Sequence, residues 1–229
     1  MKYQFKAFRA IDSPEMSMEF YRGHAQVLKD FGIDSLTSSH DEWMKNPEVY
    51  VVAAYTMDNI NVGGVKLHLY NKTHPLPVQA AIDYLDPRII SEISRLAEKG
   101  TGEACGLWIA KEMAGKNFGQ YLTRSAIALT EQLGMSTLFG FSSPHTFNMF
   151  SSLGYIPLKT VGDNGNFLYP NERYISTVII IPDIVSLEFA TEENRNRTHQ
   201  LRSSKQQEFL ESEEKNITIE YNLSLHSLV

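Results

Sequence analysis

Hydrophobic and polar residues recur along the first half of this chain with the spacings of strands and helices. Residues 3–10 alternate in character and residues 49–55 are almost all apolar, so both segments predict strands. Between them, residues 15–31 place apolar side chains mostly on one broad helical face, behind the helix start Ser13-Pro14-Glu15. Glycines at 63 and 64 predict a hairpin that leads into a strand over 65–70.

The same patterns continue on both sides of the centre of the chain. Residues 77–99 predict two helices, broken at Asp86-Pro87, and residues 174–181 predict a strongly apolar strand. Residues 191–216 are polar and permit a helix, which we expect to be exposed or packed against a partner because it has few large apolar side chains. Residues 217–225 alternate cleanly and predict a strand, either added at a sheet edge or exchanged with another subunit.

The central segment, residues 103–155, predicts a strand, a glycine-bearing turn, a helix, a second strand and a second helix. The turn covers 111–119 and opens directly into the first helix, which begins near Phe118. The first backbone N–H groups of a helix have no partner within it, and the helix dipole adds positive charge there. Glycine lets those amides approach an anion closely. The turn is therefore predicted to bind phosphate, and the partner to be a phosphorylated carrier whose cargo is transferred.

Composition narrows the classes of function. The 229 residues are 42% hydrophobic, enough for one generous domain core or for a domain with an added tail, and carry a formal net charge of −6. This charge disfavours general binding to nucleic acid or to an anionic membrane. The single cysteine excludes an internal disulfide, and no cysteine and histidine residues have the spacing of zinc ligands. Without a secretory signal pattern or a long apolar run, the expected setting is cytoplasmic.

The order of these elements, together with two segments, resembles the GNAT superfamily of N-acetyltransferases. Residues 109–119 (IAKEMAGKNFG) are similar to the end of that family's fourth strand and its pyrophosphate loop, and residues 146–155 (TFNMFSSLGY) to its later helix. Residues 103–109 (EACGLWI) have a weaker likeness to N-acyl amino acid and autoinducer synthases, which take fatty acyl groups from acyl carrier protein. The resemblance implies an α+β fold with a mixed sheet: a GNAT-like acyl-CoA N-acyltransferase domain over 1–181 and a C-terminal helix–strand extension over 182–229.

The resemblance also implies where the carrier binds. Its thioester arm would lie along the central strand, at Trp108, Ile109 and Ala110. Its pyrophosphate would lie on the loop and the helix start, at Gly115, Lys116, Asn117, Phe118, Gly119 and Gln120. Asn148 lies on the later helix, which touches the carrier in relatives. The alternative is an ordinary strand-to-helix connection with a solvated lysine and a solvent-facing Asn148.

Three residues are candidates for proton transfer. Glu103, at the start of the central strand, is the candidate base, because partial burial would raise its pKa towards neutrality. His145 has an intrinsic pKa suited to proton transfer near pH 7. Tyr169 is a candidate acid, because Phe150 occupies the position of the family's acidic tyrosine and has no proton to give. Each has a simpler alternative: Glu103 as a strand-end acid in water, His145 as a surface capping residue, and Tyr169 as an aromatic residue in the core of a hairpin.

The expected function is acyl transfer from acetyl-CoA or another acyl-CoA to the amine of a small molecule, by direct attack on the thioester and without a metal. Two alternatives stay open. One is an N-acyl amino acid or autoinducer-like synthase that depends on fatty acyl carrier protein. The other is a catalytically silent relative that binds CoA, or an interaction module that uses the C-terminal helix and strand. The C-terminal extension is also a candidate interface for a homodimer.

Overall fold

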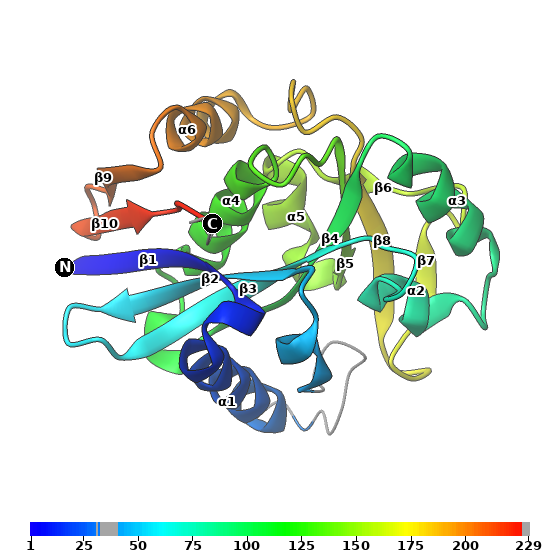
Figure 1. The fold of residues 1–229 in the computed structure, drawn as a ribbon, viewed down its shortest axis with the longest axis horizontal. Helices are drawn as coiled ribbons and strands as arrows, with labels where there is room; N and C mark the ends of the chain where they lie inside the picture. The colour runs from blue at the N-terminus through cyan, green and yellow to red at the C-terminus, as the bar shows by residue number, and fades with distance from the viewer. Residues whose placement is uncertain (31, 33–40, 226–229) are drawn as a thin grey trace.

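A computed structural model describes residues 1–30, 32 and 41–225 of the chain. Its described strands form one ten-stranded mixed sheet in the order β6-β8-β5-β4-β3-β2-β1-β10-β9, with β7 paired to β8 (Figure 1). The strands are β1 Lys2–Arg9, β2 Val49–Thr56, β3 Asn61–Leu69, β4 Thr101–Ile109, β5 Thr137–Ser142, β6 Ile156–Pro157, β7 Asn166–Leu168, β8 Ile175–Ile181, β9 Gln206–Ser212 and β10 Ile217–Asn222. The strands expected over 3–10, 49–55, 65–70 and 174–181 are therefore confirmed, and the alternating segment 217–225 forms β10.

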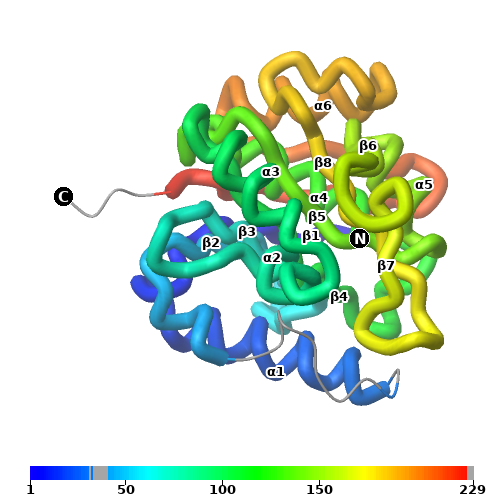
Figure 2. The backbone as a smooth tube through the Cα atoms, turned by 90° about the vertical axis from the view of Figure 1, so that its right-hand side faces the viewer, coloured from blue at the N-terminus to red at the C-terminus, as the bar shows by residue number. Residues whose placement is uncertain are grey.

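Helices cover both faces of the sheet. The α-helices are α1 Pro14–Asp30, α2 Pro77–Ile82, α3 Arg88–Ala97, α4 Phe118–Leu129, α5 Pro144–Ser152 and α6 Glu192–Ser203. α1 and α4 lie against opposite faces, and the view turned by 90° shows α1 and α6 on opposite sides of the molecule (Figures 1 and 2). β2 is apolar at nearly every position, and β3 is buried along most of its length, because both faces of the sheet are covered here. The final residue of the helix expected over 15–31 lies outside the described residues.

β4 and β5 run parallel but stay together only briefly. Their pairing covers Thr101–Glu103 of β4 and Thr137–Phe139 of β5, whereas β4 continues to Ile109 beside β3 alone. An irregularity in the β3–β4 register falls between Gly64 and Lys66, and Gly106 on β4 has a φ of 60°. Such a bulge bends a strand and increases its twist. The two central strands therefore separate beyond Glu103.

The C-terminal region departs from the sequence prediction in two ways. The segment expected as one helix over 191–216 is divided into α6 and the strand β9. α6 packs one face on α4 of the same chain rather than lying fully exposed, and its outer residues, among them Glu193, Asn196 and Gln200, are exposed as expected. β10 pairs in parallel with β1, and Lys2–Lys6 lie opposite Thr218–Asn222. The division into residues 1–181 and 182–229 stays a prediction.

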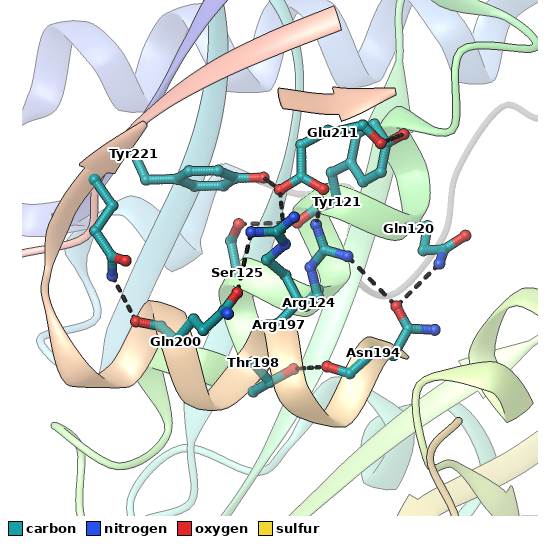
Figure 3. A network of polar contacts seen from close by, with 11 residues as sticks. Gln120, Tyr121, Arg124, Ser125, Asn194, Arg197, Thr198, Gln200, Glu211 and Tyr221 are labelled. Atoms are coloured by element: carbon teal, nitrogen blue, oxygen red, sulfur yellow. Dashed lines mark hydrogen bonds and ion pairs between the residues drawn. The ribbon is translucent and has the colours of Figure 1, made fainter. Parts of the chain in front are cut away.

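Buried hydrogen bonds explain why so polar a helix can pack within the chain. The guanidinium of Arg124 on α4 lies 2.5 Å from the Glu211 carboxylate on β9, and the Tyr221 hydroxyl donates to the same carboxylate at 2.7 Å (Figure 3). The Gln120 side chain on α4 donates to Asn194 on α6 at 3.0 Å. Polar groups can be buried when they are paired in this way. Such pairing depends on tertiary partners that helical periodicity does not reveal.

No helix in the described part of the chain combines the length and the apolar character needed to cross a bilayer.

Candidate active site

A cavity of about 520 Å³ lies where β4 and β5 separate. One wall is formed by β4, from Glu103 to Leu107, and another by the start of α5. His24 of α1, Val78 of α2, Phe141 of β5 and residues of the segment 169–176, which leads into β8, also contribute to the lining. Because the backbone of β4 has no partner from β5 beyond Glu103, this edge of the strand is open to a ligand.

Glu103 lies on the floor of this cavity. Glu103 is only 1% exposed. One of its carboxylate oxygens accepts a hydrogen bond of 2.7 Å from the backbone N–H of Val78, at the start of α2. Burial raises the pKa of Glu103 to about 8, although the Val78 hydrogen bond and the positive charge of Lys66 both oppose the rise. A carboxyl group with such a pKa exchanges its proton near neutral pH, as a general base must.

Further titratable side chains gather on the same face of β3 and β4. The register places His68 opposite Glu103 and Lys66 opposite Cys105. Burial, with a smaller contribution from Lys66, lowers the pKa of His24 to about 4 and that of His68 well below its usual value. Burial raises the pKa of the Cys105 thiol to about 12, so a protonated structural thiol fits this position better than a covalent nucleophile.

All three candidates for proton transfer line this one cavity. Glu103 is buried at the floor, whereas His145 is exposed at the second residue of α5. Tyr169 is half-buried, and its ring centroid lies 5.2 Å from that of Phe141. The structure thus brings together residues that are far apart in the sequence, and their catalytic roles stay predictions.

One buried hydroxyl near the site was not singled out from the sequence. Tyr155 follows Gly154 at the end of α5, is fully buried, and its hydroxyl has no hydrogen-bond partner among the described residues. Burial raises the pKa of Tyr155, and Glu103 and Cys105 contribute to the rise. The signal that the sequence offered is that Tyr155 ends the segment 146–155, which is similar to the later helix of the GNAT superfamily.

The predicted phosphate loop is open to solvent. Gly115 and Asn117 are exposed and have φ values of 73° and 62°. The Tyr121 N–H donates to the Asn117 carbonyl at 3.1 Å, so the amides of residues 118–120 precede the first bond of the α4 ladder. A Cβ built on Gly119 would lie 3.3 Å from the Met149 sulfur of α5, so the approach to this amide is narrow. The Lys215 ammonium donates to the Gly115 carbonyl and adds a cation beside the loop.

The predicted carrier-binding residues lie outside the cavity lining, at the end of β4, in the loop that follows it, at the start of α4 and on α5. The Trp108 ring packs on the α1 side of the sheet, and its centroid lies 6.0 Å from that of the Phe20 ring. Only the backbone of Trp108 therefore faces the region where β4 and β5 separate. The Ala110 N–H already donates to the Val62 carbonyl at 2.9 Å. Ile109 pairs with Gly63 of β3, and Asn148 is exposed on α5. Carrier binding by the loop and by these residues stays a prediction.

Among the described residues, no group of three or more histidine, cysteine, aspartate or glutamate side chains is arranged to hold a metal ion.

No protein-family model and no curated protein matches this sequence, but solved structures do match the fold. One is FeeM, an N-acyl amino acid synthase from uncultured soil microbes, with a TM-score of 0.60, 12% identity, and coverage of 78% of this chain and 97% of that chain. A second is BjaI, a CoA-dependent acyl-homoserine lactone synthase solved with SAM and isopentyl-CoA, with a TM-score of 0.59, 12% identity, and coverage of 96% and 94%. A third is an acyl-CoA N-acyltransferase from Pseudomonas aeruginosa, with a TM-score of 0.52, 9% identity, and coverage of 78% and 98%. The expected GNAT-like acyl-CoA N-acyltransferase fold is therefore confirmed.

Proposed function

We propose that this protein is an N-acyltransferase that moves an acyl group from acyl-CoA to the amine of a small acceptor. The observation that carries the proposal is the buried Glu103 at the floor of a cavity between β4 and β5, on the same strand that leads to the open loop before α4. From Glu103 to Ile109 the strand spans roughly 20 Å, at about 3.3 Å per residue. An extended carrier arm could lie along this edge, with its phosphates at the loop and its thioester at the cavity.

In this mechanism the acceptor amine attacks the carbonyl carbon of the thioester. A C–N bond forms, the C–S bond breaks, and the Glu103 carboxylate takes the proton lost by the amine. The thiolate that leaves is protonated by a cavity acid, and His145 and Tyr169 are the candidates. The chain contributes mainly by holding the two substrates in position and by stabilising charge.

One observation favours the synthase alternative. The two structures of BjaI, an acyl-homoserine lactone synthase, each cover 96% of this chain, and FeeM, an N-acyl amino acid synthase, has a TM-score of 0.60, whereas the Pseudomonas aeruginosa acyltransferase covers 78% with a TM-score of 0.52. A fatty acyl donor, carried by CoA or by acyl carrier protein, is therefore the second candidate. Acetyl-CoA as the donor, a cytoplasmic location and a homodimer formed through the C-terminal extension also belong to the proposal.

Isothermal titration and thiol release test the proposal together. We expect acetyl-CoA or a longer acyl-CoA to bind and a panel of small amines to release free CoA thiol. A synthase with a long acyl site would gain about 0.8 kcal/mol of affinity for each added methylene. A silent relative would bind CoA and release no thiol, and a user of acyl carrier protein would bind CoA weakly or not at all.

Glu103→Gln tests the base directly. We expect this variant to slow turnover strongly while acyl-CoA affinity stays the same, because the amide cannot take a proton. Glu98→Gln, an exposed glutamate at the end of α3, is the matched control and should leave turnover unchanged. Equal turnover in the two variants would remove Glu103 as the base.

A further inference from the structure

Lys66 is a fully buried lysine in the middle of β3, with apolar residues on both sides of it along the strand. It is 0% exposed and lies between Val65 and Leu67 of β3. Its ammonium lies 4.6 Å from the ring centroid of Trp43, in the short helix Glu42–Lys45. Burying a charge is costly unless neighbouring groups compensate for it. A lysine held at this position therefore calls for an explanation beyond packing.

The cation lies directly behind the β4 bulge at the cavity. A Cβ built on Gly106 would be only 2.8 Å from Lys66 Cε and 3.5 Å from Lys66 Nζ. Gly106 itself lines the cavity and has a positive φ. The absence of a side chain at this position therefore leaves the space that the end of Lys66 occupies.

The register of β3 and β4 also sets Lys66 near Glu103. Lys66 is opposite Cys105, and Glu103 lies two residues before Cys105 on the same face of the sheet. Diagonal neighbours of this kind lie within reach of long side chains. The two groups interact as opposite charges: Lys66 opposes the rise in the Glu103 pKa, and Glu103 opposes the fall in the Lys66 pKa that burial causes.

The other titratable groups that interact with this pair are uncharged near neutral pH. Burial keeps His24 and His68 neutral and the Cys105 thiol and Tyr155 hydroxyl protonated. The remaining titratable residues of the cavity lining are His145, Tyr169, Arg173 and Tyr174, from α5 and the segment before β8. Lys66 is the charged group that influences Glu103 from within the sheet.

We infer that Lys66 is a positioning residue for Glu103: its buried ammonium stabilises the carboxylate, so that the base form is available to take the proton of the acceptor amine near neutral pH. Lys66 keeps its own protons throughout and forms no bond to either substrate. Because Glu103 is a base only in the proposed function, this role depends on that function. The electrostatic coupling between the two side chains can be measured without any substrate.

The test compares Lys66→Met with the wild type by carbon-13 NMR titration of the glutamate carboxyl groups, with the Glu103 signal assigned by its loss in Glu103→Gln. Two unit charges at the roughly 7–8 Å that separates diagonal cross-strand neighbours, in a medium of effective dielectric constant about 20, shift a pKa by about 1–2 units. We therefore expect the Glu103 pKa to rise by about 1–2 units in Lys66→Met. The midpoint of the pH–rate profile should move upward by the same amount, and turnover at high pH should be largely kept.

Two further variants separate charge from packing. Lys66→Arg keeps a cation and should return the Glu103 titration towards its wild-type midpoint. His68→Leu removes a buried neutral group opposite Glu103 and should not raise that midpoint by a full unit. If Lys66→Met does not fold, Lys66→Gln tests the same loss of charge.

An unchanged Glu103 titration in the folded Lys66→Met or Lys66→Gln variant would overturn the inference. So would an upward shift in His68→Leu as large as that in Lys66→Met. Failure of the proposed function gives a different result: either the wild type would release no CoA thiol, or Glu103→Gln would keep full turnover, whatever the titration of Glu103 in the lysine variants.

Discussion

The buried ion pair between Arg124 and Glu211 offers a sharp test of how the C-terminal extension is held. The guanidinium and the carboxylate are 2.5 Å apart, and their side chains are only 2% and 3% exposed. The same carboxylate accepts the Tyr221 hydroxyl at 2.7 Å and lies 3.8 Å from Arg197 (Figure 3). Glu211→Ala would leave a buried guanidinium without its counter-charge. Removing one partner of a buried pair typically costs about 3–5 kcal/mol, and we expect a loss of that size in the free energy of unfolding.

Urea unfolding, followed by circular dichroism, measures the loss, and limited proteolysis reports whether α6 and β9 separate from the rest. The matched control is Glu208→Ala on the same strand, because its carboxylate lies 2.6 Å from the Lys2 ammonium but both side chains are about half exposed. Solvent screens exposed pairs, so no resolvable loss is expected there. The combined substitution Arg124→Met with Glu211→Leu should recover much of the stability, since it removes both buried charges. Similar losses in Glu211→Ala and Glu208→Ala would refute the reasoning that burial sets the strength of the pair.

Three other predictions concern the site and the helix that covers it. Gly119→Asp should weaken acyl-CoA binding at least tenfold by calorimetry. Gly119→Ala, whose Cβ would meet the flexible Met149 side chain at 3.3 Å and Leu107 at 3.7 Å, should change the affinity much less. Tight binding by the aspartate variant would exclude the loop as the phosphate site. The raised Glu103 pKa predicts that kcat/KM rises with pH to a plateau above about pH 8. It also predicts that the stability contributed by the buried, protonated carboxyl group is lost as pH rises from about 4.5 through about 8. Urea unfolding at several pH values should show this loss in the wild type, and Glu103→Gln should remove the contribution of this carboxyl group. Gly23→Ala should cost about 1–3 kcal/mol in the free energy of unfolding, because its Cβ would lie within 2.1 Å of the Trp108 ring; an unchanged urea midpoint would contradict that packing.

The central segment, residues 103–155, could be predicted from the sequence because its strands, turn and helices are each marked by residues within the element itself. Alternation marked the strands, glycines marked the turn before α4, and the similar family motif directed attention to Glu103. The cavity then brought Glu103, His145 and Tyr169 together. Each of these residues belongs to a segment whose place in the fold follows from the order of elements.

The sequence could not reveal features that depend on register or on tertiary pairing. Lys66 is a lysine with apolar residues on both sides of it along β3, and its relation to Glu103 appears only once β3 and β4 are aligned. α6 looked too polar to pack within the chain, because helical periodicity counts apolar side chains and not the buried partners that Asn194 and Arg124 supply. The buried hydroxyl of Tyr155 depends in the same way on what surrounds it.

The parallel pairing of β10 with β1 has a consequence for how this chain is made. β1 is synthesised before β10, and the edge of β1 that faces away from β2 gains its partner only when residues 217–222 have left the ribosome. Until then that edge can pair with strands of other chains, which is a common route to aggregation. Deleting β9 and β10 should therefore reduce the yield of dispersed protein even if the cavity itself forms.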